Sequence, residues 1–253
     1  MIKTALRTVI GRKGTGYLAS PPDGRDVLRA PILGVAALPE KAMAPAVKVV
    51  LRDQGATQSC TAHAIDYAKQ ALGGKNGDTS RRAVQYGYYN GRAYAGMQRD
   101  DGGAILRDVL RADSKLGAPP DADAPLRWTT VNRQPSALAY RDGMPWRGLR
   151  YSAIVGTNDQ RLHAVRDALA HGHPVVGGWQ VDQAFIDGDG DHVATVCGGR
   201  SVGGHAMAIT GYDGGYYRVP NSWGAAWRDH GSVWFGAGAV VEAMELWVLE
   251  GWT

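Results

Sequence analysis

Cysteine is scarce in this chain of 253 residues, where Cys60 and Cys197 are the only two. Two thiols cannot build a disulfide-rich scaffold or a zinc–thiolate centre. Long apolar runs are also lacking, since no stretch approaches the ~20 residues of a membrane-spanning helix. The apolar part of residues 1–10 is too short and too interrupted for a secretory signal peptide. We therefore predict no membrane span and no structural disulfide, and a reducing location such as the cytoplasm.

An excess of charge of one sign is missing as well. The chain has 28 Lys and Arg against 24 Asp and Glu, and its net charge is +4. The basic residues are spread along the chain, which indicates a solvated surface and not a nucleic-acid site. Hydrophobic residues make up 44% of the chain, which is enough for a globular core.

The sequence offers little to a metal ion. The histidines between positions 163 and 192 do not show the spacing of a zinc site. Residues 187–192 begin like a calcium-binding loop, but His192 replaces the glycine of the sixth position and Gly198 the glutamate of the twelfth. We predict a solvated turn at this point, and neither a metal nor a cofactor for the protein.

What the chain does have is a cysteine in an activating position. Residues 54–60 read Gln-Gly-Ala-Thr-Gln-Ser-Cys, a glycine-containing turn that leads into the start of a helix. The first turn of a helix has unpaired N–H groups and a partial positive charge, and both favour a thiolate. Because the thiolate is the nucleophilic form, Cys60 is a candidate nucleophile, and Gln54 is placed to direct an amide at the group attacked.

Periodicity predicts helices first and strands later. The predicted helices are 60–72, 80–94, 105–116 and 159–171, and the predicted strands are 174–179, 193–197, 205–212, 215–219, 232–235 and 245–249. This order favours an α+β fold, with a helical part at about 46–125, a β part at about 170–253 and a cleft between them. Residues 1–45 contain several prolines and are predicted to form an extended arm over the globule, or a removable pro-segment.

Two motifs in the second half supply partners for Cys60. His205 follows Gly203-Gly204 and leads an apolar strand, and Asn221 precedes Ser222-Trp223-Gly224. A cysteine, a histidine and an asparagine can act as nucleophile, base and orienter. His63 lies one helical turn from Cys60, and we interpret it as a packed helix residue. Cys197 is predicted to lie in the core.

These motifs together resemble the papain family of cysteine peptidases, above all its compact bacterial and phage members. His205 follows Cys60 by 145 residues and Asn221 follows His205 by 16, and the order of the three is that of the family. The resemblance implies a papain-like fold with Cys60 as nucleophile, His205 as base, Asn221 as orienter and Gln54 as oxyanion donor. It also implies a substrate-binding set made of Gly102, Gly103, Gln58, Gly204 and Trp223.

Some positions depart from the pattern of the family. Gln58 stands where a glycine is usual, Thr61 replaces a large indole, and Gly204 replaces a common acidic residue. These changes bear on substrate preference more than on the type of reaction. The resemblance therefore implies an endopeptidase that acts on peptide or protein substrates through an acyl-enzyme.

Two other functions are kept beside the endopeptidase. One is a hydrolase of cell-wall peptides carried in a phage virion or tail. The other is a papain-like scaffold with a structural or binding role in a phage particle, as a homo-oligomer or within the virion assembly.

Overall fold

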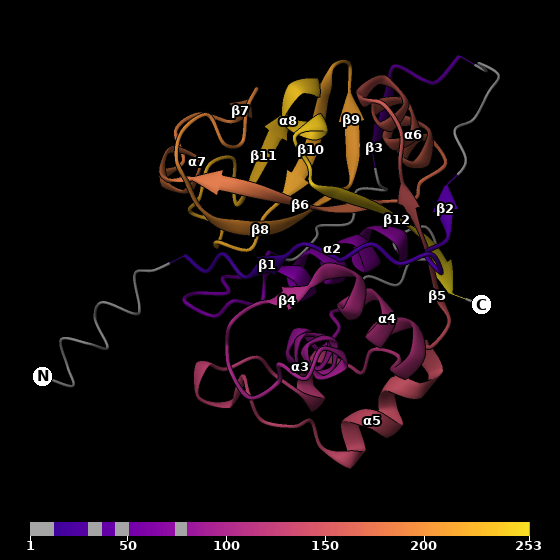
Figure 1. Cartoon of the computed structure of the whole chain (residues 1–253), viewed down its shortest axis with the longest axis vertical. Helices are drawn as coiled ribbons and strands as arrows, with labels where there is room; N and C mark the ends of the chain where they lie inside the picture. The colour runs from indigo at the N-terminus through magenta and orange to yellow at the C-terminus, as the bar shows by residue number, and fades with distance from the viewer. Residues whose placement is uncertain (1–12, 30–36, 44–50, 74–79, 253) are drawn as a thin grey trace, which may run out of the picture.

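The structure is a computed structural model that describes residues 13–29, 37–43, 51–73 and 80–252. Helix α2 (Cys60–Gly73) runs through its middle, with a group of helices on one side and strands on the other (Figure 1). All residues of α2 are buried. Its many alanines allow this, because small side chains let a helix approach neighbours on every face. The prediction of a central helix at 60–72 is confirmed.

The helical half packs against α2 through α3 (Val84–Tyr94) and α4 (Leu106–Leu116), and α5 (Ala137–Gly143) lies at its outer end (Figure 1). Helix α3 begins four residues later than predicted. The reason is that the backbone N–H of Ala83 donates to the Pro119 carbonyl at 2.9 Å, which keeps the residue before the helix extended.

The other half is built on two five-stranded sheets that are mainly antiparallel. One sheet has the order β2-β5-β12-β6-β8, and the other β3-β9-β10-β11-β7. The strands are β2 (Leu28–Arg29), β3 (Lys41–Met43), β5 (Leu149–Ile154), β6 (Val175–Asp182), β7 (His192–Val193), β8 (Ser201–Ile209), β9 (Gly211–Asp213), β10 (Tyr216–Pro220), β11 (Ser232–Phe235) and β12 (Glu245–Trp252). Helices α6 (Asn158–Ala170), α7 (Gln183–Asp187) and α8 (Ala237–Val241) complete this half.

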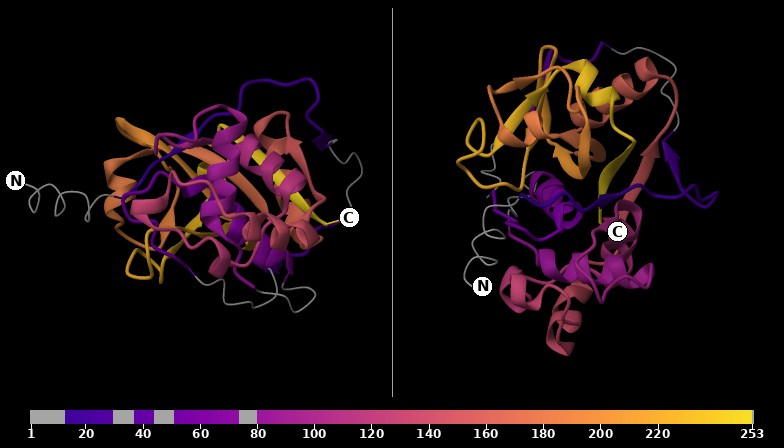
Figure 2. Two further views of the ribbon diagram at one scale, coloured as in Figure 1. Left: turned by 90° about the horizontal axis from the view of Figure 1, so that it is seen from below. Right: turned by 60° about the vertical axis from the view of Figure 1, so that its left-hand side comes forward.

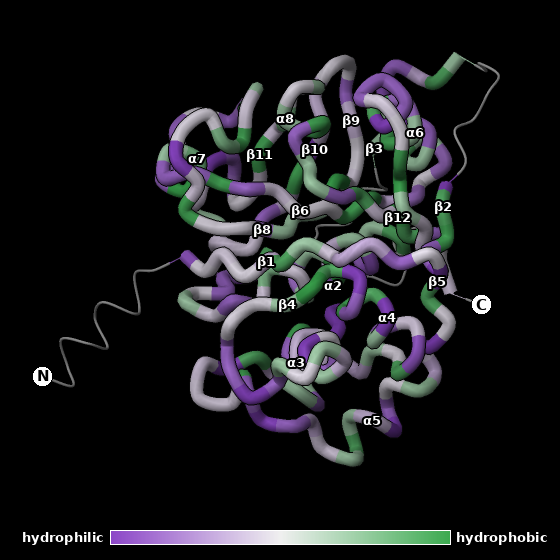
Figure 3. The backbone as a smooth tube through the Cα atoms, in the orientation of Figure 1, coloured by the Kyte–Doolittle hydropathy of each residue, from purple (hydrophilic) through white to green (hydrophobic). Residues whose placement is uncertain are grey.

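The apolar interior follows the same division. One cluster of buried side chains lies between α2, the helices and the inner face of β6, β8 and β12, and a second fills the space between the two sheets. Figure 3 shows hydrophobic stretches in α2 and β12 near the middle of the molecule. The predicted α+β, papain-like class is confirmed.

One sequence prediction in the β half was wrong, and one strand was missed. Residues 194–197 do not form a strand, because the backbone N–H groups of Val196 and Cys197 donate to the Glu242 carboxylate and not to a neighbouring strand. Strand β5 was not predicted, although it pairs with β12 along most of its length. A short apolar run before the Gln54 turn, residues 47–51, lies outside the described residues except for Leu51.

The N-terminal arm is woven into the fold rather than laid over it. Strand β1 (Tyr17–Leu18) pairs in parallel with β4 (Ala104–Ile105), β2 extends one sheet beside β5, and β3 extends the other beside β9. The right-hand view of Figure 2 shows this indigo segment crossing the molecule between its two halves. Within the described residues, no helix is both long and apolar enough to span a membrane.

Candidate active site

Cys60 is the first residue of α2 and is fully buried. Burial raises the pKa of its thiol to about 11, and hydrogen bonds from the backbone of Ala206, Gly16 and the first residues of α2 offset only part of that rise. The position at the start of a helix is the predicted one. The full burial of Cys60 was not predicted, and burial favours the protonated form of the thiol.

His205 lies on β8 and is also fully buried. Its Nε2 atom lies 2.7 Å from Oδ1 of Asn221, and the same oxygen accepts the backbone N–H of Ser222 at 2.7 Å. The Trp223 indole stacks on the imidazole, with 4.2 Å between ring centroids and 23° between planes. Asn221 therefore fixes the tilt of the ring while Trp223 covers one of its faces.

The second imidazole nitrogen of His205 faces no hydrogen-bond partner among the described residues. Within the described residues, Nδ1 of His205 has no hydrogen-bond partner, and neither has Nδ2 of Asn221. Burial lowers the pKa of His205 to about 4, against the opposing effect of the Asn221 hydrogen bond. Both shifts favour a thiol and a neutral imidazole over an ion pair. Buried polar atoms without partners are uncommon in proteins and concentrate where function requires them.

Gln54 precedes α2 and is anchored on both ends of its amide. Nε2 donates to the Thr57 carbonyl at 2.6 Å, and Oε1 accepts from the Ser222 hydroxyl at 2.5 Å. The backbone of Gln54 also donates to the Ser222 carbonyl at 2.9 Å. Ser222 thereby ties Gln54 to Asn221 across the two halves of the molecule.

The arm fills the space in front of these residues. The Gly14 carbonyl accepts from Nε2 of Gln54 and from Nε1 of Trp223, each at 3.3 Å. Two residues on, the backbone of Gly16 forms a bridge with Gly204 and hydrogen-bonds the Cys60 sulfur. A peptide segment of the protein itself thus lies against Cys60, Gln54 and Trp223.

Glycine permits this close approach. A Cβ atom on Gly16 would lie 2.0 Å from the Gln58 carbonyl oxygen, and one on Gly14 would lie 1.9 Å from the Thr57 carbonyl oxygen. Any larger residue would force the segment away from the turn before α2. The arm can therefore lie in the cleft as observed only with glycine at positions 14 and 16.

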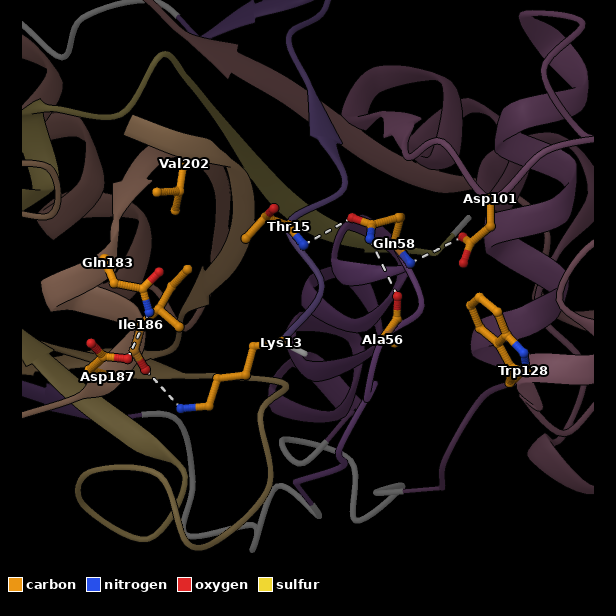
Figure 4. A pocket seen from close by; sticks show the side chains of 10 residues that line it. All are labelled: Lys13, Thr15, Ala56, Gln58, Asp101, Trp128, Gln183, Ile186, Asp187 and Val202. Carbon is orange, nitrogen blue, oxygen red and sulfur yellow. Dashed lines mark hydrogen bonds between the residues drawn. The ribbon is translucent and has the colours of Figure 1, made fainter. Parts of the chain in front are cut away.

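Figure 4 shows the pocket at the outer end of this cleft. Lys13 and Thr15 of the arm line it between Asp101 and Gln58 on the helical side and α7 on the sheet side. The backbone N–H of Thr15 donates to Oε1 of Gln58 at 3.0 Å, and Lys13 donates to the Ile186 carbonyl at 2.7 Å. Gln58 thus lines this pocket, and its side-chain oxygen is bound by the arm.

The predicted backbone site at Gly102 and Gly103 is occupied in the same way. The Ala104 N–H donates to the Gly16 carbonyl at 2.9 Å, and a Cβ atom on Gly103 would lie 2.3 Å from that oxygen. Gly102 has open space around its Cα. Gly204 faces the arm from the other wall. The structure brings Gly103, Gln58, Gly204 and Trp223 against the arm, whereas a Cβ atom built on Gly102 would have no atom within 4 Å.

The remaining sequence hypotheses have mixed outcomes. His63 is buried in α2 with Nδ1 against the Ser59 carbonyl at 3.0 Å, so it is packed as predicted. Cys197 was predicted in the core but is partly exposed. Among the described residues, no three His, Cys, Asp or Glu side chains are placed to hold a metal ion.

Sequence reasoning missed three residues of the cleft, namely Gly16, Tyr17 and Ser222. Ser222 could have been found, since a hydroxyl between Asn221 and Trp223 has few directions to face once its neighbours are assigned. Gly16 and Tyr17 gave no comparable signal, because their contacts lie on segments far away in the sequence.

Comparison with known proteins found relatives but no matching family model. An uncharacterized peptidase C1-like protein of Acanthamoeba polyphaga mimivirus is 29% identical over 194 residues, which cover 71% of this chain and 61% of that protein. The chain thus spans less than two thirds of the length of that curated relative.

Solved structures match a larger share of this chain than the curated relative does. Xylellain, a cysteine protease from Xylella fastidiosa, is 26% identical, with a TM-score of 0.85 over 95% of this chain and 97% of that structure. Procathepsin B from Trypanosoma congolense shares the fold, with a TM-score of 0.71 over 94% and 87% and an identity of 14%. This chain therefore has a papain-like fold, and the proteins that it resembles are a cysteine protease and a peptidase C1-like protein.

Proposed function

We propose that the protein is a cysteine endopeptidase whose own segment Lys13–Leu18 keeps it latent. The observation that carries the proposal is the buried hydrogen bond between His205 and Asn221, covered by Trp223 and placed beside a cysteine at the start of α2. A cysteine nucleophile, a histidine base and a group that orients the base are the parts that acyl transfer through a thioester requires.

In the proposed reaction, His205 takes the proton of Cys60 and the sulfur attacks the carbonyl carbon of a peptide bond. The oxyanion accepts hydrogen bonds from Nε2 of Gln54 and from the N–H of Cys60. The imidazolium gives its proton to the departing amine, which leaves a thioester. Water, deprotonated by His205, then attacks the thioester and releases the carboxylate product and the free thiol.

Latency follows from the atoms that the arm covers. The Gly14 carbonyl takes the Gln54 N–H that the oxyanion would use, and the Gly16 backbone lies at the sulfur. The arm also keeps water out, and this favours the uncharged thiol and imidazole over an ion pair. Departure of the arm would free the donor and rehydrate Cys60 and His205 in one step.

A peptide-library assay tests the proposal. The full chain is compared with Gly16→Ala, whose added methyl would meet the Gln58 carbonyl, and with Gly24→Ala as a matched control, because no atom lies within 4 Å of the added methyl there. Cleavage by Gly16→Ala that disappears in Gly16→Ala/Cys60→Ala supports the proposal. No cleavage and no alkylation of Cys60 in Gly16→Ala would overturn it.

A second candidate, a papain-like scaffold with a binding role, is favoured by one observation. The described residues include no hydrogen bond between the Cys60 sulfur and Nδ1 of His205, and the arm fills the cleft. If the arm fills the cleft permanently, Gly16→Ala should unfold the protein or leave Cys60 unreactive toward alkylation. A latent enzyme predicts a folded variant with a reactive Cys60.

The substrate class is proposed to be peptides or proteins. Purified bacterial sacculi in the same assay separate a cell-wall hydrolase from a general endopeptidase, since only the former releases peptide fragments from them. Location in the cytoplasm or in a virion, and assembly into an oligomer, stay predictions of the sequence.

A further inference from the structure

A row of buried polar side chains lies beside the turn that leads into Cys60. Thr57, Ser59 and His63 come from this turn and from the first turn of α2, and each is at most 3% exposed. The proposed reaction gives none of the three a role. Buried polar groups cost stability unless they are hydrogen-bonded, and here each side chain lies within hydrogen-bond distance of the next.

His63 holds the carbonyl of Ser59 through two nitrogen atoms. Its backbone N–H donates to that oxygen at 3.2 Å, and its Nδ1 lies 3.0 Å from the same oxygen. Because a carbonyl oxygen only accepts, Nδ1 carries a proton. Burial lowers the pKa of His63 to about 3, so the ring is neutral at physiological pH and has this single N–H. The imidazole is therefore a donor toward Ser59.

The two hydroxyl groups continue from His63 in one direction. Nδ1 of His63 also lies 3.3 Å from the Ser59 hydroxyl, whose oxygen lies 2.7 Å from that of Thr57. The Thr57 hydroxyl gives its own proton to the Gln54 carbonyl at 2.8 Å, so it accepts from Ser59. The hydrogen bonds thus point from the imidazole, through both hydroxyls, to a backbone carbonyl.

The far end of this row fixes Gln54, whose side chain is the proposed oxyanion donor. The Gln54 carbonyl accepts from the hydroxyl of Thr57 and also from its backbone N–H, the latter at 3.2 Å. In return, Nε2 of Gln54 donates to the Thr57 carbonyl at 2.6 Å. Gln54 and Thr57 are bound to each other in both directions, so the rotamer of Thr57 bears on the direction of the Gln54 amide.

The near end of the row fixes the other proposed donor, the backbone N–H of Cys60. This N–H and the Ser59 carbonyl belong to one peptide unit, which is trans, and in a trans peptide the two groups point in opposite directions. His63 holds the carbonyl, so it also sets the direction of the N–H. Rotation of this peptide plane would turn the donor away from the oxyanion.

We propose that His63 is a positioning residue for the oxyanion site: through Ser59 and Thr57, it keeps the Cys60 N–H and the Gln54 amide in the directions that the oxyanion needs. The inference rests on the proposed peptidase function. Fully bonded polar networks in a low-dielectric interior make their surroundings rigid. Donors stabilise an oxyanion most when they are oriented before the reaction begins.

Peptide hydrolysis by the full-length Gly16→Ala chain tests the inference. His63→Phe removes the ring donor, and Thr57→Val removes one hydroxyl at nearly constant volume. Each should lower kcat by about tenfold or more and change KM by less than about twofold. His63→Asn and Thr57→Ser should recover most of kcat, because both keep a donor. The amide nitrogen of asparagine is as many bonds from Cα as Nδ1 of histidine is.

Two further measurements separate positioning from a structural role. Alkylation of Cys60 by iodoacetamide forms no oxyanion, so its rate should stay within about twofold in each of these variants. Thr57→Val should also change kcat little in a chain that carries Gln54→Ala, since the donor that it positions is already gone. Equal losses of alkylation and hydrolysis would mean a disturbed site and would overturn the inference.

Ser152→Ala is the matched control in the other half of the molecule. It removes a buried hydroxyl that donates to Glu250 at 3.1 Å, and it should leave kcat unchanged. If His63→Phe does not fold, the smaller change Thr57→Val decides the question. An unchanged kcat in Thr57→Val would overturn the inference and leave the peptidase function standing. If the Gly16→Ala chain neither cleaves peptides nor is alkylated at Cys60, the proposed function fails and the inference falls with it.

Discussion

The two cysteines of the chain lie in opposite surroundings. Cys60 begins α2, is fully buried and is covered by the arm, while Cys197 is partly exposed in the loop before β8. Burial raises the pKa of both thiols, and at Cys197 the carboxylates of Asp182 and Glu242 add to the effect. Cys60 accepts hydrogen bonds from the first N–H groups of α2 and from the backbone of Ala206, the residue after His205. If the arm keeps the protein latent, as proposed, it makes the buried Cys60 less accessible than the partly exposed Cys197.

The sharpest test of this contrast removes each thiol in turn in the Gly16→Ala background. We expect Cys60→Ala to lower kcat/KM for a cleaved peptide by at least about 10⁴-fold, because loss of the nucleophile ends acyl transfer. Cys197→Ala should stay within about twofold of its parent. Initial rates of peptide hydrolysis measure both. Retained activity in Cys60→Ala would show that the nucleophile lies elsewhere.

Gln54 is expected to give the next largest effect. Gln54→Ala removes the proposed oxyanion donor, and kcat should fall by about 10²- to 10³-fold while KM changes little. Gln58→Ala, four residues away in the same turn, lacks this role and should change KM more than kcat. Equal losses of kcat in the two variants would contradict the assignment of the donor.

Displacing the arm should reverse the order in which the two cysteines react. In the full-length chain we expect iodoacetamide to modify Cys197 before Cys60, because solvent reaches only the former. Gly16→Ala should speed the modification of Cys60 about tenfold or more and leave the rate at Cys197 unchanged. The control variant Gly24→Ala should change neither rate. Mass spectrometry of the two peptides gives both rates in one sample. A slow Cys60 in folded Gly16→Ala would mean that the arm is not what shields it.

The smallest expected effect is the pH dependence of arm closure. The raised pKa of Cys60 adds closed-state stability that is complete below its ordinary value of 9.0 and lost as pH rises through about 11. The lowered pKa of His205 adds stability that is complete above its ordinary value of 6.5 and lost as pH falls through about 4. Amide-exchange protection of residues 14–18 should therefore be greatest between about pH 6.5 and 9.

Cys60→Ala is the control for this profile, because it should flatten the alkaline limb and keep the acid limb. A profile of the same shape in the variant would assign the alkaline limb to another group.

Much of the fold and most of the candidate site followed from the sequence. The helix from Cys60, the strand that carries His205 and the strand that ends before Asn221 were predicted from periodicity and from glycine and proline positions, and all three are present. These elements are long or strongly apolar, so local pattern and final packing agree. Strand β5 was missed because it is short and its identity depends on pairing with β12, which lies far away in the sequence.

The chain by itself determined the chemistry available to the site: a cysteine at a helix start, a histidine on an apolar strand, an asparagine beside a tryptophan. Only the tertiary structure decided the state of that chemistry. Residues Gly14 to Tyr17 reach Gln54, Cys60 and Glu245 across 40 to 228 positions of sequence, and no local pattern encodes such contacts. Burial raises the pKa of the Cys60 thiol, and part of what surrounds it is this distant segment and not the sequence around Cys60.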